Sequence, residues 1–275
     1  MLLMTGKEVA AAVQNEIASA VETLKKDSIA LKLAIVIVGD DPAAHAYKNR
    51  MVKLAESLRI ATDVTILPAD IQMSELFTVI CNLNKDPNVT GILPMMPLPK
   101  HLNPRVVADA IGIVKDVDCL NIQNIGELYS TNGQWAPCTP RAVMAVLDYY
   151  KIPLSGKHAV VIGRSNVVGK PLANLLLAQN ATVTVCHSRT TNIAEITKQA
   201  DIIVAAVGVP AFVTADMVKE GAVVVDVGIN LVDGKLVGDV EPAVAEKAGA
   251  FTPVPGGIGT VTTTMMIKAL LRNYL

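Results

Sequence analysis

A glycine-containing turn connects an apolar run to the start of a helical pattern in segment 158–171, HAVVIGRSNVVGKP. Backbone N–H groups at the amino end of a helix bind phosphate, and glycine lets the main chain approach a pyrophosphate closely. The spacing departs from G-x-G-x-x-G, because Ser165 holds the second glycine position and Gly169 comes last. The segment predicts a variant dinucleotide-binding turn, for which a plain strand–helix connection is the alternative.

The next apolar run, ATVTVCHSR, ends in residues that bear on the choice of dinucleotide. An NAD site commonly has Asp or Glu at this place to hold the ribose 2′-hydroxyl. Here the run ends in Ser188 and Arg189, and Arg164 lies in the preceding turn. A hydroxyl and guanidinium groups suit a 2′-phosphate, which a carboxylate would repel. We therefore expect NADP rather than NAD, with two solvated surface arginines as the alternative.

Apolar runs that alternate with amphipathic segments indicate the elements around these residues. Helices are expected near 5–25, 42–58 and 74–83, and strands near 33–38, 62–67 and 90–93. From residue 141 the pattern resumes with five or so strand–helix pairs, and a last helix begins near residue 262. Helical crossovers return the chain in the same direction, so the strands are expected to be parallel. The pattern predicts an α/β fold.

Segment 94–140 differs from the rest, because it is rich in Pro, Asn and Gly and lacks periodicity. We expect loops there, and loops on a rigid α/β frame commonly carry binding groups. The segment also marks a domain boundary. We predict an N-terminal domain over residues 1–140 and a Rossmann-type dinucleotide-binding domain over 141–261, with the last helix, about 262–275, packing back on the N-terminal domain.

Composition argues against several kinds of partner. The 24 Lys and Arg against 25 Asp and Glu leave no charge excess that would attract nucleic acid or an anionic membrane. The 4 cysteines form no C-x-x-C pair, and the 4 histidines show no ligand spacing, so neither a disulfide framework nor a metal is expected. No signal peptide or apolar stretch of about 18 residues is seen. A cytoplasmic protein is expected.

Several motifs follow one another along the chain and carry a family resemblance. They are Tyr47, KDVD at 115–118, PCTPR at 137–141, GRSNVVGKP at 163–171, DVGIN at 226–230 and TPVPGGIGT at 252–260. In this order and spacing the chain resembles the FolD family, the bifunctional methylenetetrahydrofolate dehydrogenase/methenyltetrahydrofolate cyclohydrolases. The resemblance implies an N-terminal catalytic domain, a Rossmann-type NADP-binding domain, a cleft between them and a homodimer.

The resemblance also implies a reaction of one-carbon metabolism and the residues that hold its substrate. NADP would oxidise 5,10-methylenetetrahydrofolate to the methenyl form, which water would then open to 10-formyltetrahydrofolate. Tyr47 would stack on the aminobenzoyl group of this tetrahydrofolate derivative, and Asp118 would hydrogen-bond its pterin ring. Pro255, Gly256 and Gly257 would close the cleft from the other domain.

For the cofactor, the resemblance implies a second group of residues. Gly163, Arg164 and Ser165 would hold the phosphates of NADP. Ser188 would lie near the 2′-phosphate, in agreement with the residue types at the end of that strand, and Ile229 would lie beside the nicotinamide.

Two methionines stand where the family usually has polar side chains. The family's lysine four residues after the tyrosine is Met51 here, and the glutamine before PLP is Met95. In the family that lysine is the main polar group of hydrolysis, and the glutamine orients it. A thioether has no proton to give and is only a weak acceptor. We therefore predict that hydride transfer is retained, because the cofactor supplies the acceptor carbon, whereas hydrolysis is weak or absent.

Neighbouring lysines do not restore the missing amine. At about 100° per residue, Met51 lies roughly 40° around the helix from Tyr47. Lys48 lies roughly 60° beyond Met51, and Lys53 lies roughly 160° from it. Lys53 points away, and Lys48 would reach the site only with a bent stem.

Two smaller departures border the expected folate site. Cys119 follows KDVD where glycine is common, and Thr260 follows PGGIG where proline is common. We expect Cys119 to be a small packing residue. The departures keep two alternatives open: a catalytically silent relative that binds NADP or folate, and a dehydrogenase for another reduced pterin.

Overall fold

The computed structural model describes residues 1–130 and 135–274, which form two compact units. The six-stranded unit comprises Met1–Ala11 and Leu128–Thr262, and the three-stranded unit comprises Ala12–Glu127 and Thr263–Leu275. Three helices, α1 (Gly6–Lys26), α5 (Ile122–Ser130) and α9 (Ile258–Lys268), contribute residues to both units. Each unit is described by itself below.

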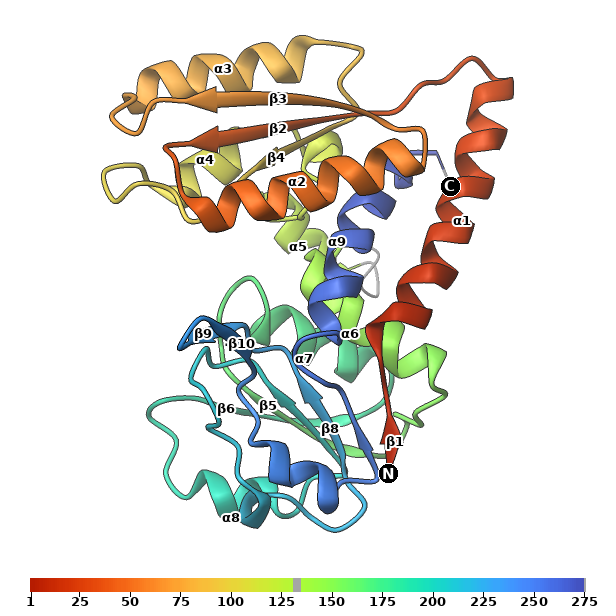
Figure 1. Cartoon of the computed structure of the whole chain (residues 1–275), viewed down its shortest axis with the longest axis vertical. Coiled ribbons are helices and arrows are strands. Elements are labelled where there is room, and N and C mark those ends of the chain that lie inside the picture. Colours follow the sequence, from red (N-terminus) through yellow and green to blue (C-terminus); the bar gives the residue numbers. More distant parts are fainter. Residues whose placement is uncertain (131–134, 275) are drawn as a thin grey trace. The chain divides into compact units, whose positions relative to one another are not determined.

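All strands of the six-stranded sheet are parallel, in the order β1-β11-β8-β7-β5-β6 (Figure 1). The strands are β1 (Leu2–Leu3), β5 (His158–Ile162), β6 (Thr182–Cys186), β7 (Ile202–Ala205), β8 (Val223–Asp226) and β11 (Ala250–Phe251). The chain leaves β5 for β6 on one side and later returns to β7 on the other. Ligands of such sheets bind at this reversal, beyond the carboxyl ends of the strands.

Helices cover both faces of this sheet, which explains why its central strands are continuous runs of Val, Ile and Ala. Val160 and Ile162 of β5 lie in a buried cluster against which Ile193 and Ile196 of α8 (Ile193–Thr197) pack. Helix α7 (Gly169–Ala178) packs on β5 and β6 and also contacts α6 (Cys138–Tyr149). Burying each such aliphatic side chain contributes about 1.5–3 kcal/mol.

The three-stranded sheet is also parallel, in the order β3-β2-β4 (Figure 1). Its elements are β2 (Lys32–Val38), α2 (Pro42–Ser57), β3 (Ala61–Leu67), α3 (Met73–Lys85), β4 (Gly91–Pro94) and α4 (Pro104–Ala110). Alternate residues of a strand face opposite sides of the sheet. Ala34 and Val36 pack with Leu76 of α3 and Val107 of α4, while Ile35 is buried on the other face.

The compact units divide the chain differently from the boundary expected at residue 140. Leu2 pairs with Ala250 and Leu3 with Phe251, so the first residues belong to the six-stranded unit rather than to the N-terminal domain. The division falls after Glu127. The last helix starts earlier than expected, at Ile258 instead of near residue 262. Pairing across most of the chain has no local sequence signal, so these features were not predictable from periodicity.

Segment 94–140 is not loops throughout, so that expectation was wrong in part. It contains α4, a 3-10 turn η1 (Ile113–Lys115) and α5 (Ile122–Ser130), and residues 131–134 lie outside the described part. Asn103 starts α4, because its side-chain oxygen accepts a hydrogen bond from the N–H of Arg105 at 2.9 Å. Asn followed by Pro is a helix-start signal, but these helices are too short for an apolar stripe to reveal them.

The remaining elements are short. They are the antiparallel hairpin β9 (Asn230–Val232) and β10 (Lys235–Val237) and the 3-10 turns η2 (Ala215–Met217), η3 (Pro242–Glu246) and η4 (Ala269–Leu271). Within residues 1–130 and 135–274, no helix has both the length and the apolar character needed to cross a membrane.

Candidate functional site

The turn between β5 and α7 is built around two glycines at points of close backbone approach. Gly163 has φ +128°, and a Cβ at this position would lie 2.2 Å from the carbonyl oxygen of Ala206, which follows β7. A Cβ on Gly169 would lie 2.1 Å from the carbonyl oxygen of Gly163. Only glycine fits either place. The first glycine therefore sits at the reversal of strand order, and the second lets α7 begin close to β5, as dinucleotide sites require.

Ser165 organises the start of α7. Its hydroxyl oxygen accepts hydrogen bonds from the N–H of Val168 at 3.0 Å and of Gly169 at 3.4 Å. The carbonyl oxygen of Ser165 accepts from the N–H of Lys170 at 3.1 Å. Ser165 thus stabilises the turn that leads into α7, whose N-cap residue is Val168, and the sequence interpretation did not include this role. Arg164 beside it is exposed.

The end of β6 presents a hydroxyl and a cation at the surface. The N–H of His187 donates to the hydroxyl of Thr190 at 2.9 Å, and the N–H of Arg189 donates to Nδ1 of His187 at 3.1 Å. These bonds use the main chain of the turn and leave the side chains of Ser188 and Arg189 exposed. No carboxylate stands in this turn. The residues present therefore fit a 2′-phosphate, and His187 serves the turn rather than a proton transfer.

A buried carboxylate, Asp226, ends β8. It accepts hydrogen bonds from the N–H of Gly228 at 2.9 Å, of Asp239 at 2.9 Å and of Val240 at 3.0 Å. Burial raises the pKa of Asp226 to about 6, against the opposing effect of these three backbone N–H groups, and the nearby Asp239 carboxylate raises it further. Asp226 belongs to the DVGIN motif, yet the motif alone did not reveal this role.

Asp239 is a second buried carboxylate, and the sequence interpretation missed it. One oxygen accepts from the N–H of Val207 at 2.7 Å and of Gly208 at 2.9 Å, and the other accepts from Nδ2 of Asn230 at 2.9 Å. Asp239 thereby ties the segment after β7 to the segment after β8, at the carboxyl edge of the sheet. Ile229, which was expected beside the nicotinamide, lies between Asp226 and Asn230 in the sequence, and its side chain is exposed.

Pro255, Gly256 and Gly257 lie in the six-stranded unit, between β11 and α9. The carbonyl oxygen of Gly256 accepts a hydrogen bond from the N–H of Gly6 at 2.7 Å, at the start of α1. Pro255 and Gly256 are exposed, whereas Gly257 is buried. A contact between the first helix and this glycine pair was not expected.

Tyr47 and Met51 share helix α2 but differ in exposure. The hydroxyl of Tyr47 lies 3.3 Å from Sδ of Met266 on α9, and the guanidinium carbon of Arg50 lies 5.6 Å from the centre of the tyrosine ring. The side chain of Met51 is fully buried, at 0% exposure. A cation close to the Tyr47 ring is therefore Arg50, three residues along the helix. The comparison of Lys48 with Lys53 had overlooked it, although three-residue spacing is a recognised helix-neighbour signal.

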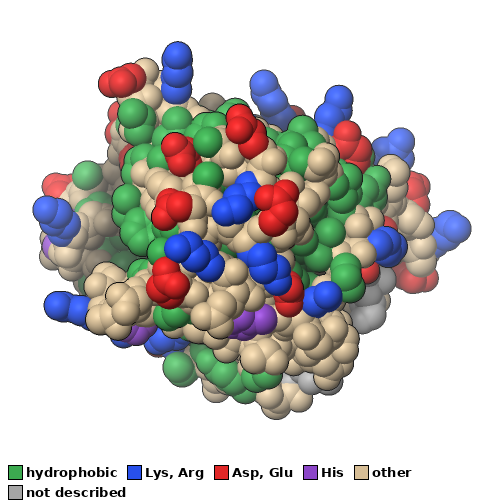
Figure 2. All heavy atoms as spheres, turned by 90° about the horizontal axis from the view of Figure 1, so that it is seen from below, with side chains coloured by type: hydrophobic (Ala, Val, Ile, Leu, Met, Phe, Trp, Pro, Cys, Tyr) green, Lys and Arg blue, Asp and Glu red, His purple; other side chains and the backbone are tan. Residues whose placement is uncertain are grey.

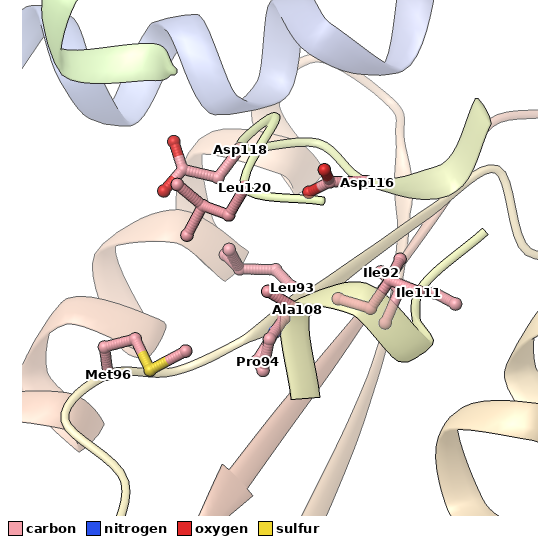
Figure 3. Close-up of a pocket in the computed structure, with 9 residues that line it drawn as sticks. All are labelled: Ile92, Leu93, Pro94, Met96, Ala108, Ile111, Asp116, Asp118 and Leu120. Carbon is pink, nitrogen blue, oxygen red and sulfur yellow. The ribbon is translucent and has the colours of Figure 1, made fainter. Parts of the chain in front are cut away.

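A small pocket lies where β4 ends and the KDVD segment passes over it (Figure 3). Its walls are mainly aliphatic, formed by Ile92, Leu93, Pro94, Met96, Ala108, Ile111, Asp116, Asp118 and Leu120. Met96 is 37% exposed and lines the pocket, whereas Met95, at the expected glutamine position, is 5% exposed and is not among the lining residues. The structure thus brings Asp118 together with Met96 rather than with Met95.

The acidic and basic residues of KDVD have separate roles. Nζ of Lys115 donates to two carbonyl oxygens near the end of α3, at 2.6 and 3.0 Å. The buried carboxylate of Asp116 accepts from the N–H of Asn121 and from Nδ2 of Asn124, both at 2.8 Å, and burial raises its pKa. In Figure 3 the carboxylate of Asp118 points away from that of Asp116. Asp118 is thus the member of the motif suited to a ligand.

In the described parts of the chain, no group of three or more His, Cys, Asp and Glu side chains could hold a metal ion. The arrangement instead offers two kinds of site. The carboxyl edge of the six-stranded sheet suits a dinucleotide, and the small pocket beside Asp118 has aliphatic walls and the carboxylates of Asp116 and Asp118.

Two family models together match most of the chain. Residues 4–118 match the family described as tetrahydrofolate dehydrogenase/cyclohydrolase, catalytic domain, and residues 137–275 match its NAD(P)-binding domain. The bifunctional protein FolD of Moorella thermoacetica is 48% identical over 268 residues, which cover 97% of this chain and 96% of that protein.

Solved structures show the same likeness over the full length. The bifunctional enzyme FolD from Campylobacter jejuni has a TM-score of 0.97 and 41% identity, with 100% of both chains covered. FolD from Trypanosoma brucei, crystallised with NADP cofactor and inhibitor, has a TM-score of 0.94 and 35% identity, with 99% of this chain and 96% of that chain covered. The expected family is confirmed, because both of its domains, their order and their folds are present: the chain belongs to the tetrahydrofolate dehydrogenase/cyclohydrolase family.

Proposed function

We propose that the chain is an NADP-dependent 5,10-methylenetetrahydrofolate dehydrogenase of one-carbon metabolism. The observation that carries this proposal is the glycine-built β5–α7 turn next to a β6 end with Ser188 and Arg189 and no carboxylate, in a member of this family. NADP, when bound, supplies the carbon that accepts the hydride. The side chains then have to bind and orient, which makes modest chemical demands on them.

We assign the cofactor and folate contacts to separate groups of residues. The main chain at Gly163 and Ser165 holds the cofactor phosphates, and Arg164, Ser188 and Arg189 hold the 2′-phosphate. The support is the exposure of the three side chains and the glycine geometry of the turn. Ile229 contacts the nicotinamide side, which agrees with its exposed position between the anchors of Asp239.

Tyr47 and Asp118 are the proposed folate contacts. Tyr47 is partly buried and its hydroxyl contacts Met266, so the orientation of its ring is restricted before any substrate arrives. A restricted ring loses little entropy when an aminobenzoyl group stacks on it. Asp118 lines an aliphatic pocket, where a hydrogen bond from a pterin N–H group to a carboxylate gains strength from the low local dielectric.

Hydrolysis of the methenyl product is proposed to be weak or absent. Met51 is fully buried and Met95 is 5% exposed, so the two thioethers pack in the interior and present no proton-transfer group to a substrate. Arg50 near Tyr47 does supply a positive charge. A guanidinium stays protonated in proteins, however, and therefore does not accept the proton that hydrolysis has to move.

Two assays on the purified protein test these proposals. With methylenetetrahydrofolate and NADP, NADPH absorbance should rise, and NAD should support a much lower rate. With methenyltetrahydrofolate alone, loss of its absorbance should not exceed the rate in buffer. A protein that forms no NADPH but binds NADP would be the silent relative, and efficient hydrolysis would overturn the assignment of Met51 and Met95.

We further propose that two copies associate into a homodimer through the β9–β10 hairpin. Leu231 on this hairpin is 71% exposed, and Val232 and Leu236 are exposed as well. Exposed apolar side chains on a short hairpin favour burial against a second surface. Light scattering after gel filtration should give twice the chain mass, and Leu231→Glu should give the monomer. A monomeric wild type would refute the dimer.

The proposed partner of the enzyme is a small folate, not nucleic acid or a membrane, and its proposed location is the cytoplasm. On the face shown in Figure 2, Lys and Arg side chains are mixed with Asp and Glu, so that face offers no extended basic surface to a polyanion. Cys81, Cys119, Cys138 and Cys186 are all free thiols, which suits a reducing compartment.

A further inference from the structure

Arg272, at the end of the turn η4, reaches back to the segment that carries Asp118. Its Nη1 donates to Sγ of Cys119 at 2.7 Å, and its Nη2 donates to the carbonyl oxygens of Ile113 and Asp116, both at 3.1 Å. We name residues 113–120 the Asp118 loop. One guanidinium thus contacts this loop at three points, two of which stand on either side of Asp118.

The Asp118 loop needs contacts from outside it to keep its backbone conformation. Cys119 has φ +53°, in the left-handed region that side chains other than glycine rarely adopt. The sulfur of Cys119 is fully buried, so the residue is held in this conformation by its surroundings. A planar guanidinium fixes both the position and the direction of its acceptors, which a flexible ammonium does not. Arg272 can therefore set the path of the chain between Asp116 and Cys119.

The residue after Arg272 adds to the same contact. Nδ2 of Asn273 donates to the carbonyl oxygen of Val114 at 2.8 Å. The positive charge of Arg272 also favours the ionised form of the buried Asp116. The C-terminal end of the chain and the Asp118 loop thus form one hydrogen-bonded assembly within the three-stranded unit.

We propose that Arg272 is a positioning residue for the folate substrate. It does not touch the substrate. It holds the Asp118 loop so that the carboxylate of Asp118 faces the pocket beside Leu93 and Met96. This inference rests on the proposed function, because it takes Asp118 as the pterin contact. Loss of Arg272 should therefore weaken folate binding and leave NADP binding and kcat nearly unchanged, since the cofactor contacts are proposed in the six-stranded unit.

The size of the effect follows from the bonds lost. Losing one hydrogen bond from a charged donor changes an equilibrium about tenfold, and we expect one such factor to reach substrate binding because Arg272 acts on the substrate only through the loop. Arg272→Gln should raise KM for methylenetetrahydrofolate about tenfold, with less than a twofold change in kcat and in KM for NADP. Arg272→Lys keeps the charge but has no planar fork, so it should rescue only part of the loss.

Two further variants test the route through Cys119. Cys119→Ser keeps an acceptor for Nη1 and should raise KM less than Arg272→Gln does. Cys119→Gly removes that acceptor but suits the left-handed backbone and keeps both carbonyl contacts, so its KM should also stay below that of Arg272→Gln. Arg59→Gln is the matched control, because Arg59 makes only a surface ion pair with Glu22 at 2.8 Å in the same unit, and KM should not change.

The measurements are steady-state kinetics, calorimetric titration of each variant with tetrahydrofolate in the absence of NADP, and thermal unfolding to establish that each variant is folded. A folded Arg272→Gln protein with wild-type KM and tetrahydrofolate affinity would overturn the inference while the proposed function stands. A rise in KM for NADP and a fall in kcat as large as the rise in KM for the folate would also overturn it, because such changes indicate general damage. A wild type that neither forms NADPH nor binds tetrahydrofolate would overturn both proposals.

Discussion

The proposed loss of hydrolysis rests largely on Met51, and the burial of this side chain makes a sharp stability prediction. Lysine at this fully buried position would lose hydration, which disfavours its charged form. Met51→Lys should therefore lower the free energy of unfolding by about 4 kcal/mol at pH 7. Its folded-state pKa would be depressed, so the penalty should shrink as pH rises toward the unfolded value of about 10.4. Urea unfolding at pH 7 and at pH 9.5 measures both effects.

Met51→Leu is the control for that substitution, since a volume-conserving swap should cost less than about 1.5 kcal/mol at either pH. A lysine variant as stable as the wild type would show that position 51 is more accessible than its burial indicates. Activity adds a second readout. If the two methionines are the reason for weak hydrolysis, Met51→Lys combined with Met95→Gln should gain cyclohydrolase activity that neither variant gains alone.

Substitution of Arg189 tests the proposed preference for NADP over NAD. Its exposed guanidinium is proposed to contact the 2′-phosphate, which NAD lacks. Arg189→Ala should therefore raise KM for NADP about tenfold and leave KM for NAD unchanged. Lys151→Ala is the control, because Lys151 is an exposed cation in the same unit, paired only with Asp148 at 3.4 Å. Equal changes in KM for both cofactors would contradict the role of Arg189.

Roles that depend on neighbours in the sequence could be proposed from the sequence, whereas roles that depend on distant contacts could not. Ser188 and Arg189 could be proposed as cofactor contacts because a strand end and its side chains lie together in the sequence. Arg272 gave no signal, because its partners precede it by more than a hundred residues. Asp239 was missed for the same reason, since it holds backbone N–H groups of a different strand end.

At the scale of elements, the β5–α7 turn is the part most sensitive to added volume. Gly163→Ala would place a methyl group 2.2 Å from the Ala206 carbonyl oxygen in a backbone with φ +128°. It should lower the free energy of unfolding by about 3 kcal/mol and weaken NADP binding. Calorimetric titration with NADP and urea unfolding provide the two measurements.

Gly126→Ala is the matched control for that turn. Gly126 lies inside α5 with no atom within 4 Å of the added methyl group, so alanine should stabilise by roughly 0.5 to 1 kcal/mol. The prediction would be wrong if both alanine variants changed stability by the same amount, because the steric reason applies only to Gly163.

Long elements with clear periodicity were predictable, and short ones were not. β2 and β3 lie within a residue of their expected bounds: β2 is a continuous apolar run, as expected of a buried parallel strand, and β3 is a partly exposed edge strand rich in β-branched residues. The two-residue strands β1 and β11 exist only because they pair with each other and with β8. α4 starts at Asn103-Pro104 and α5 starts after Asn121, and such sequence is equally typical of loops.

At the scale of the whole molecule, neither compact unit is a continuous piece of chain. The six-stranded unit takes its edge strand β1 from the N-terminus, and the three-stranded unit takes residues from the C-terminus, including Arg272. The order of motifs along the sequence therefore indicated two domains correctly but placed the boundary away from the division of the compact units. The chain ends matter to both proposed sites, since Arg272 holds the Asp118 loop and Gly6 bonds to Gly256.

The buried Asp226 predicts how the stability of the molecule depends on pH. Its folded-state pKa is about 6 against 3.8 for the ordinary group, so folding favours the protonated form. The stability that this group contributes is complete below about pH 3.8 and is lost as pH rises through about 6. The shift corresponds to about 3 kcal/mol between those limits. Asp226→Asn cannot titrate, so its baseline stability differs but this loss is absent.

Urea unfolding of the wild type and Asp226→Asn at half-unit steps from about pH 4 to about pH 7 tests the sign. The wild-type free energy of unfolding should fall relative to that of the variant as pH rises, because all other groups titrate alike in both proteins. A difference that stays constant would show that the three backbone N–H groups on Asp226 balance its burial and keep its pKa near the ordinary value. A difference that moves in the opposite direction would mean that they depress it, and Asp226 would then stabilise the cofactor edge of the sheet most strongly at neutral pH.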